Sequence, residues 1–270
     1  MDMNEVKARG IVLLGCGRMG SALLKGWLAD GFPPASVYVQ DPAPSDWLRS
    51  VDGLHLNGSL PQRPAVLLVA VKPQMMAEAL PQIAGIGGGD TLAISVAAGT
   101  PISLLEEAIG TGTPVIRAMP NTPAAVGRGI TALVGNDAGT PHLGLAEEML
   151  SAVGQTVRLE EEGQMDAVTA VSGSGPAYVF HLIETLAQAG EAEGLSPELA
   201  LQLARATVAG AGALAEGAGE TPAALREGVT SPGGTTAAAL KVLMDDETGF
   251  PPLLRRAVKA AADRSRELRG

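Results

Sequence analysis

The sequence has 270 residues, 29 of them acidic and 19 basic, and a formal net charge of −10 at pH 7. This length suggests one or two domains. The acidic balance argues against nucleic acid or an anionic membrane as a partner.

Other features of the composition concern packing and cellular compartment. Hydrophobic residues make up 46% of the chain and aromatic residues only 3%, so small side chains do much of the packing. The single cysteine excludes an intrachain disulfide and favours a reducing compartment. The N-terminus lacks the basic region of a signal peptide, and no apolar run reaches membrane-spanning length. We therefore expect a cytoplasmic protein.

A strand, a glycine turn and a helix are predicted near the start of the chain. Within residues 10–29, a short apolar run leads into Gly-x-Gly-x-x-Gly, and apolar side chains at helical intervals follow. This order is typical of a dinucleotide-binding turn. Gly15 permits the tight turn, Gly17 lets the pyrophosphate approach the backbone, and Gly20 lets the helix pack on the strand. We expect this turn to bind the pyrophosphate of a nicotinamide dinucleotide.

The second predicted strand, residues 37–41, ends in an acidic residue. Asp41 lies about where a carboxylate meets the adenosine ribose of a dinucleotide. That carboxylate would repel a 2′-phosphate, and the next basic residue is Arg49. Acceptance of NADH is therefore favoured, although Ser45 and Asn57 remain able to solvate a phosphate. The alternative is that Asp41 forms a turn before the following proline.

Further apolar runs predict a parallel sheet that helices cover on both faces. They give way to small or polar residues at the edge where open α/β sheets bind ligands. The runs cover residues 65–71, 91–96 and 115–118. Residues 131–134 and 156–159 are predicted as further strands, with a helix between them at 141–152. We expect residues 1–162 to form a doubly wound α/β Rossmann domain.

After residue 162 the strand signals disappear, and alanine, leucine and glycine recur at helical spacing. Pro176, and the Ser-Pro and Thr-Pro pairs at Ser196 and Thr221, are typical of helix starts. The predicted helices cover residues 177–193, 198–215, 223–228, 235–245 and 251–267. Helices with so few large side chains bury little area alone, so we expect residues 163–270 to form an all-α dimerisation domain that interlocks with a second subunit.

The most distinctive stretch is Ser-Pro-Gly-Gly-Thr-Thr at residues 231–236, ahead of an alanine-rich helix. Pro232 fixes one φ angle, and the two glycines free the next two. Thr235 or Thr236 is predicted to cap the helix. Backbone N–H groups and hydroxyls at the positive end of a helix suit a small carboxylate. The alternative is a capped turn without a ligand.

The titratable residues favour an imine rather than a ketone as the group reduced. The three histidines lie outside the predicted strand-end loops, and residues 164–194 contain no lysine. A β-hydroxyacid-type dehydrogenase, the enzymatic alternative, relies as a family on a lysine of its interdomain helix. A protonated cyclic imine needs mainly proximity and orientation. A non-catalytic dinucleotide-sensing protein is the other alternative, but a sensor would have no use for a carboxylate cradle.

Six stretches, in order along nearly the whole chain, resemble the pyrroline-5-carboxylate reductase family. They are residues 11–20, 70–73, 95–99, 116–123, 171–180 and 225–243. The resemblance implies hydride transfer from NADPH or NADH to L-1-pyrroline-5-carboxylate, which gives L-proline in the final step of proline biosynthesis. It also implies a Rossmann domain, a helical dimerisation domain, and a homodimer able to assemble further.

The resemblance also implies site residues. The cofactor is expected to contact the glycine turn and four further segments: Gly15, Cys16, Gly17, Arg18, Met19, Gly20, Asn57, Ala70, Val71, Lys72, Pro73, Ala97, Ala98, Gly99 and Asn121. The N–H groups of Gly234, Thr235 and Thr236 are expected to hold the substrate carboxylate. Ser174 is expected to close the pocket, and the Thr236 hydroxyl to face the ring nitrogen as the catalytic group. We expect no metal.

One loop departs from the family pattern. Residues 40–44 are acidic and rich in proline, where many relatives carry small hydroxyl or basic residues. This difference leaves the preference for NADPH open. Cys16 and Tyr178 are expected to pack rather than react, and Glu220 to be a solvated carboxylate at a helix start.

Overall fold

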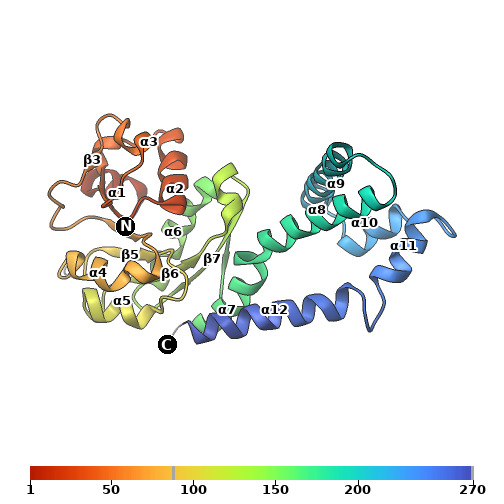
Figure 1. Ribbon diagram of the computed structural model, residues 1–270. Coiled ribbons are helices and arrows are strands. Elements are labelled where there is room, and N and C mark those ends of the chain that lie inside the picture. The colour runs from red at the N-terminus through yellow and green to blue at the C-terminus, as the bar shows by residue number, and fades with distance from the viewer. Residues whose placement is uncertain (87–88, 269–270) are drawn as a thin grey trace. The chain divides into compact units, whose positions relative to one another are not determined.

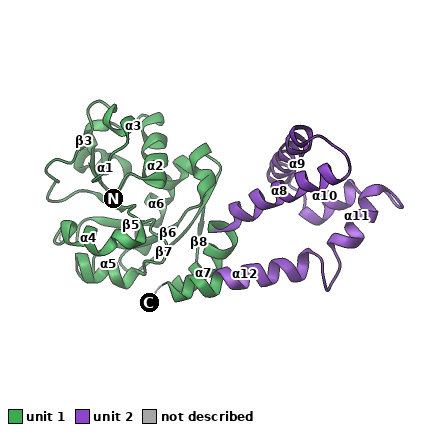
Figure 2. Cartoon of the chain, in the orientation of Figure 1, with its two compact units in different colours: residues 1–173, 262–270 green, residues 174–261 purple. Residues whose placement is uncertain are grey.

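The computed structural model describes residues 1–86 and 89–268. The chain divides into two compact units (Figure 2). The first unit contains Met1–Gly173 and the end of the chain from Ala262, and the second contains Ser174–Ala261.

Within the described residues, the first unit contains an eight-stranded sheet with the order β3-β2-β1-β4-β5-β6-β7-β8. The strands are β1 (Ile11–Leu14), β2 (Val37–Gln40), β3 (His55–Leu56), β4 (Val66–Val69), β5 (Leu92–Ser95), β6 (Val115–Met119), β7 (Gly129–Gly135) and β8 (Gly154–Arg158). Strand β1 pairs in parallel with both β2 and β4. The strand order therefore changes direction between β1 and β4, which confirms the predicted doubly wound α/β class.

Helices surround this sheet (Figure 1). The α-helices of the first unit are α1 (Met3–Arg9), α2 (Arg18–Ala29), α3 (Asp46–Arg49), α4 (Met76–Ala79), α5 (Ile102–Ile109), α6 (Leu143–Leu150) and α7 (Met165–Val168). Short 3₁₀ turns are Pro34–Ser36, Pro73–Met75, Leu80–Ile83, Thr122–Val126, Thr140–His142, Ser151–Val153 and Glu162–Gln164, and Thr169–Gly173 is a π-helix.

Alternate residues of the central strands pack into two buried clusters. Ile11 and Leu13 of β1 join residues of α2 and α6, whereas Val12 and Leu14 join residues of α4 and α5. Because successive side chains of a strand point to opposite faces, helices cover the sheet on both sides. This two-sided burial explains why the central strands are apolar throughout.

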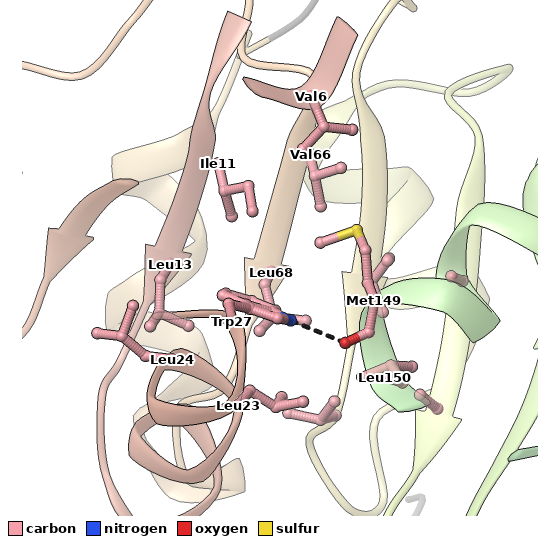
Figure 3. Packing of buried hydrophobic residues seen from close by; sticks show 14 of the residues in the cluster. Val6, Ile11, Leu13, Leu23, Leu24, Trp27, Val66, Leu68, Met149 and Leu150 are labelled. Atoms are coloured by element: carbon pink, nitrogen blue, oxygen red, sulfur yellow. Dashed lines mark hydrogen bonds between the residues drawn. The ribbon is translucent and has the colours of Figure 1, made fainter. Parts of the chain in front are cut away.

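Trp27 connects α2 with α6 inside the first cluster (Figure 3). Its indole Nε1–H donates a hydrogen bond of 2.7 Å to the backbone oxygen of Met149. A buried indole needs such a partner. The contact fixes α2, and therefore the glycine turn that leads into it.

Several elements differ from the sequence prediction. The directions of the last two strands were not predicted: β7 is antiparallel to β6, and β8 is parallel to β7. Helix α1, strand β3 and helices α3, α4 and α5 were outside the predicted elements. The predicted helix at 141–152 is helix α6 with a 3₁₀ turn at each end.

The second unit is helical, as predicted. Its helices are α8 (Gly175–Ala192), α9 (Pro197–Gly217), α10 (Pro222–Gly228), α11 (Thr235–Leu243) and the first part of α12 (Phe250–Glu267). The side chain of Ser196 caps α9 by accepting the N–H of Leu199, and Thr221 caps α10 by accepting the N–H of Ala224. Small side chains form the buried contact of α8 with α9: Ala187, Ala200 and Ala204.

The predicted boundary after residue 162 precedes the division between the units. Residues 163–173 and the last turns of α12 belong to the first unit. Met165 is buried in its second cluster, and the buried Ser265 hydroxyl donates a 2.8 Å hydrogen bond to Asp166. Across the described residues, the helices are too short or too polar to cross a lipid bilayer.

Candidate active site

Asn57 follows β3, and the other predicted cofactor residues of the first unit follow the carboxyl ends of five neighbouring parallel strands. Strands β2, β1, β4, β5 and β6 lie side by side in that order. They lead, in the same order, to Asp41, Gly15–Gly20, Ala70–Pro73, Ala97–Gly99 and Asn121. The structure therefore brings these segments together along one edge of the sheet, and β1 and β4 flank the point where the strand order changes direction.

Steric constraints in the turn after β1 explain two of its glycines. Gly15 has φ +84°, and a Cβ there would lie 2.8 Å from the Cγ1 of Val71. A Cβ on Gly20 would lie 2.6 Å from the Gly15 oxygen. The backbone therefore needs glycine at both positions. The turn and the close helix packing have the geometry expected from the sequence.

The start of α2 provides an anion-binding geometry. Gly17 is the N-cap residue, and a Cβ added to it would point into open space. Because glycine has no side chain to cap the helix, the N–H groups of the first turn remain for another acceptor. Arg18 and Met19 begin this turn, and Arg18 is exposed. A pyrophosphate is the ligand that this arrangement suits.

Cys16 differs from its neighbours in the turn. Its backbone N–H donates a 2.7 Å hydrogen bond to the Asp41 carboxylate, so this donor is used within the protein. Its buried sulfur lies 3.5 Å from the Ser21 hydroxyl oxygen. Burial raises the pKa of the Cys16 thiol. The side chain therefore has the environment of a packing residue, as expected.

Asp41 joins the turn after β2 to the glycine turn. Its second carboxylate oxygen accepts the N–H of Ala43 at 2.8 Å. The Asn57 side chain bonds the Asp41 backbone twice, because its oxygen accepts the N–H at 2.9 Å and its amide donates to the carbonyl at 2.8 Å. Both alternatives for Asp41 thus have a basis in the structure: it forms a local turn, and it lies at the predicted cofactor edge.

The loops after β4 and β5 present mainly backbone. The Ala70 N–H donates to the Leu14 oxygen at 2.8 Å. Lys72 is exposed and precedes a 3₁₀ turn that begins with Pro73. After β5, the Ala97 N–H donates to the Ser95 hydroxyl at 3.3 Å, while Ala98 is exposed. These loops offer little charge, which suits a neutral nicotinamide ring.

Asn121 holds neighbouring segments together. Its amide donates to the Ser172 oxygen at 3.2 Å, and its side-chain oxygen accepts the N–H of Ile130 at 3.0 Å. Ser172 lies in the π-helix Thr169–Gly173, which directly precedes Ser174. Asn121 therefore supports this edge by linking three segments of the first unit.

In the second unit, Ser174 is the N-cap residue of α8, and Pro176 lies in its first turn. The predicted helix start at Pro176 is confirmed. Ser174 follows the π-helix directly, and π-helices often mark functional sites.

The turn before α11 corrects one expectation. The Gly234 N–H donates to the Ser231 oxygen at 3.0 Å, and Gly233 has φ +71°. Pro232 followed by a glycine with positive φ is typical of a type II turn. Gly234, and neither Thr235 nor Thr236, is the N-cap residue of α11. The turn takes up the Gly234 N–H, so the N–H groups of Thr235 and Thr236 in the first helical turn are those left for a carboxylate.

The three histidines make contacts of other kinds. His55 stacks on Tyr38 with ring centroids 4.3 Å apart. His142 precedes α6, where burial lowers its pKa. His181 lies 3.1 Å from Glu184 on α8. Among the described residues, no group of three or more His, Cys, Asp and Glu side chains is arranged to hold a metal ion.

Comparisons with known proteins cover both units. Residues 162–268 match the family model for pyrroline-5-carboxylate reductase dimerisation, and residues 10–99 match that for NADP oxidoreductase coenzyme F420-dependent. The pyrroline-5-carboxylate reductase of Pseudomonas aeruginosa is 39% identical over 96% of this chain and 96% of its own length. The pyrroline-5-carboxylate reductase of Synechocystis is 41% identical over 95% of this chain and 97% of its own length.

Solved structures agree with these sequence matches. The pyrroline-5-carboxylate reductase of Coxiella burnetii has a TM-score of 0.88 and 34% identity, and the match covers 97% of this chain and 99% of that one. The pyrroline carboxylate reductase of Plasmodium falciparum, solved with NADP bound, has a TM-score of 0.82 and 29% identity. The match covers 98% of this chain and 99% of that one. The family and the reductase class predicted from the sequence are confirmed: the chain belongs to the pyrroline-5-carboxylate reductase family.

Proposed function

We propose that this chain reduces L-1-pyrroline-5-carboxylate to L-proline with NADPH or NADH, the final step of proline biosynthesis. The observation that carries this proposal is the edge of the first unit, where the glycine turn and four neighbouring strand ends lie in one row. Relatives more than a third identical over nearly the whole chain carry the name of this activity.

The donors and open space at the first turn of α2 fit the pyrophosphate of a dinucleotide. Gly17, Arg18 and Met19 would hold it, since the uncapped first turn presents N–H groups and Arg18 adds a positive charge. Asp41 would accept the ribose hydroxyls. Ala70–Pro73 and Ala97–Gly99 would line the nicotinamide half. When bound, the reduced nicotinamide supplies a hydride.

The substrate carboxylate would be held at the start of α11. The N–H groups of Thr235 and Thr236 lie in the first turn of this nine-residue helix, where the helix dipole favours an anion. Gly233 and Gly234 shape the approach through the type II turn. Ser174, at the start of α8, would close the pocket.

The Thr236 hydroxyl is the group we assign to the ring nitrogen. In the reduction, the hydride forms a C–H bond at the imine carbon, and the carbon–nitrogen π electrons become a lone pair on nitrogen. The imine binds in its protonated form, so the nitrogen keeps that proton and becomes a secondary amine. Thr236 then needs only to orient the ring, and orientation supplies a large part of such a rate.

The second unit would bury its apolar surface against another copy of the chain. Large apolar side chains of α8, α9 and α11 are exposed, including Phe180, Leu214 and Val242. Exposed apolar surface of this kind marks interaction sites. The match to a dimerisation model supports a homodimer, with residues 1–162 as the dinucleotide-binding domain and 163–270 as the dimerisation domain. We place the reaction in the cytoplasm, in keeping with the single cysteine.

The test follows the absorbance of the reduced cofactor. NADH or NADPH is mixed with pyrroline-5-carboxylate or with a cyclic imine without the carboxylate, and its oxidation is recorded. In a separate assay the oxidised cofactor is mixed with a β-hydroxyacid, and its reduction is recorded. We expect turnover that requires pyrroline-5-carboxylate and yields proline. Turnover of the β-hydroxyacid alone would favour the dehydrogenase alternative. Cofactor binding without any turnover would favour the sensor alternative.

Thr236→Ala and Thr236→Ser test the assigned hydroxyl. We expect the alanine variant to lose about tenfold to a hundredfold in kcat, with little change in cofactor affinity, because one hydrogen bond to the reacting ring is lost. The serine variant keeps the hydroxyl and should retain most of the activity. Equal kcat values for wild type and Thr236→Ala would remove Thr236 from the mechanism.

A further inference from the structure

The connection between the glycine turn and the end of β2 depends on a single carboxylate. One oxygen of Asp41 accepts the Cys16 N–H at 2.7 Å, and the other accepts the Ala43 N–H at 2.8 Å. Each carboxylate oxygen can accept a further hydrogen bond. The carboxylate can therefore hold the glycine turn and still accept the hydroxyls of a bound ribose.

The position of this carboxylate depends on a second residue, Asn57. The Asn57 side chain uses both of its polar atoms on the Asp41 backbone, at 2.9 Å to the nitrogen and 2.8 Å to the oxygen. Its own N–H donates to the Val39 oxygen at 2.8 Å. These contacts fix the backbone of Asp41 at the end of β2, and so the direction of its side chain.

The Asn57 backbone has an uncommon conformation that supports this contact. Its φ is +53°, and it is the only non-glycine residue of the described chain with a positive φ. Asparagine tolerates this left-handed region better than most residues, and glycine tolerates it freely. The conformation turns the chain just after β3, where the side chain meets the Asp41 backbone.

We propose that Asn57 is a positioning residue for the adenosine half of the cofactor and that it acts through Asp41 rather than by its own contact. This role rests on the proposed function, since it assumes that the sheet edge holds a dinucleotide. Both polar atoms of the Asn57 side chain bond the Asp41 backbone, and the Asp41 carboxylate keeps acceptors for a ribose diol. A ribose 2′-hydroxyl can donate to this carboxylate, whereas a 2′-phosphate is repelled by it.

The test uses Asn57→Gly, which removes the side chain but keeps the positive φ accessible. Dissociation constants are measured by calorimetric titration with three probes: NADH, ADP-ribose, which is the dinucleotide without its nicotinamide, and nicotinamide mononucleotide, which lacks the adenosine. We expect affinity for NADH and for ADP-ribose to fall about tenfold, and affinity for the mononucleotide to stay within twofold. Unchanged affinity for ADP-ribose would overturn the proposed role.

Gln40→Ala is a matched control for general loosening of this loop. The Gln40 side-chain amide donates a 2.7 Å hydrogen bond to the Gly58 oxygen. This bond joins the same two segments but does not involve Asp41. We expect this variant to bind ADP-ribose as the wild type does. A loss equal to that of Asn57→Gly would assign the effect to loop stability and overturn the role of Asn57.

A double-mutant cycle with Asp41→Ala tests the route of the effect. If Asn57 acts through Asp41, the double variant should bind ADP-ribose about as weakly as Asp41→Ala alone. Full additivity of the two losses would mean that Asn57 contacts the ligand itself, and would contradict the proposal. Melting temperatures of all variants verify that they are folded.

These titrations are independent of turnover. If the wild type binds NADH but reduces no imine, the proposed function fails while the titrations still decide the role of Asn57. If imine reduction is observed and the titrations show no effect of Asn57→Gly, the proposed function stands and the role of Asn57 fails.

Discussion

The Arg117 guanidinium lies 2.7 Å from the Glu162 carboxylate, and the same oxygen accepts the N–H of Ile102 at 3.0 Å. Arg117 is on β6 with a side chain only 2% exposed, and Ile102 begins α5. Glu162 therefore neutralises a buried charge and also supports the start of a helix. This contact joins the central sheet to the segment that leads toward the second unit.

Removal of the Glu162 carboxylate should therefore destabilise the folded protein. We expect Glu162→Ala to lower the free energy of unfolding by about 3 kcal/mol, because it leaves a buried guanidinium without its counter-charge. The measurement is urea unfolding followed by circular dichroism. Glu147→Ala is the control, since it breaks the more exposed pair with Arg158 and should cost less than about 1 kcal/mol. Equal losses in the two variants would refute this assignment.

The glycine turn allows stability and cofactor binding to be separated. Gly20→Ala places a Cβ 2.6 Å from the Gly15 oxygen, so the turn must shift and the melting temperature should fall by several degrees. Gly17→Ala places its Cβ in open space, where we expect the pyrophosphate. It should melt like the wild type but bind NADH at least tenfold more weakly. Wild-type NADH affinity in Gly17→Ala would show that the pyrophosphate lies elsewhere.

The raised pKa of the Cys16 thiol predicts slow chemical modification. Burial disfavours the thiolate and so moves the pKa above the ordinary value of 9.0. Iodoacetamide should therefore label the native protein slowly at pH 7.5, and faster as the pH rises past that value. The reference is the protein unfolded in urea. Its thiol is exposed, so it should be labelled rapidly at the same pH. Rapid native labelling at pH 7.5 would contradict this environment.

The proposed dimer predicts that exposed apolar residues of the two units differ in their effect on association. Phe180 on α8 is 59% exposed, and Val126 of the first unit is 77% exposed. We expect the wild type to sediment as a dimer or larger assembly. Phe180→Asp should shift the equilibrium toward the monomer, because burial of an unpaired carboxylate is unfavourable, whereas Val126→Asp should not. A monomeric wild type at micromolar concentration would argue against the proposal.

Local signals explain what could be predicted from the sequence. The order of apolar run, Gly15, Gly17, Gly20 and amphipathic helix is a short-range pattern, and the structure has it as predicted. The caps at Ser196 and Thr221 are equally local. Strand directions that depend on distant pairing could not be predicted. The antiparallel direction of β7 is set by its pairing with β6, and the residues of β7 alone do not indicate it.

Competing local preferences account for other differences. Thr235 ranks with Gly234 among N-cap residues. Pro232 and the positive φ of Gly233 fix a type II turn that ends at Gly234, so the helix begins one residue earlier than a cap at Thr235 requires. The hydrogen bonds from the Asn57 side chain to the Asp41 backbone were not predicted, because they depend on how the fold brings these two distant residues together. Asparagine followed by Gly58 was the one local signal, since this pair is frequent in turns with positive φ.

Hydride transfer to the imine carbon is the central claim, and isotopic labelling tests it most directly. The protein is incubated with pyrroline-5-carboxylate and NADH that carries deuterium at the transferable C4 position, and the proline formed is examined by mass spectrometry and NMR. We predict one deuterium per proline, bound to the ring carbon that was the imine carbon. Proline without deuterium, or loss of NADH absorbance without proline, would contradict the account.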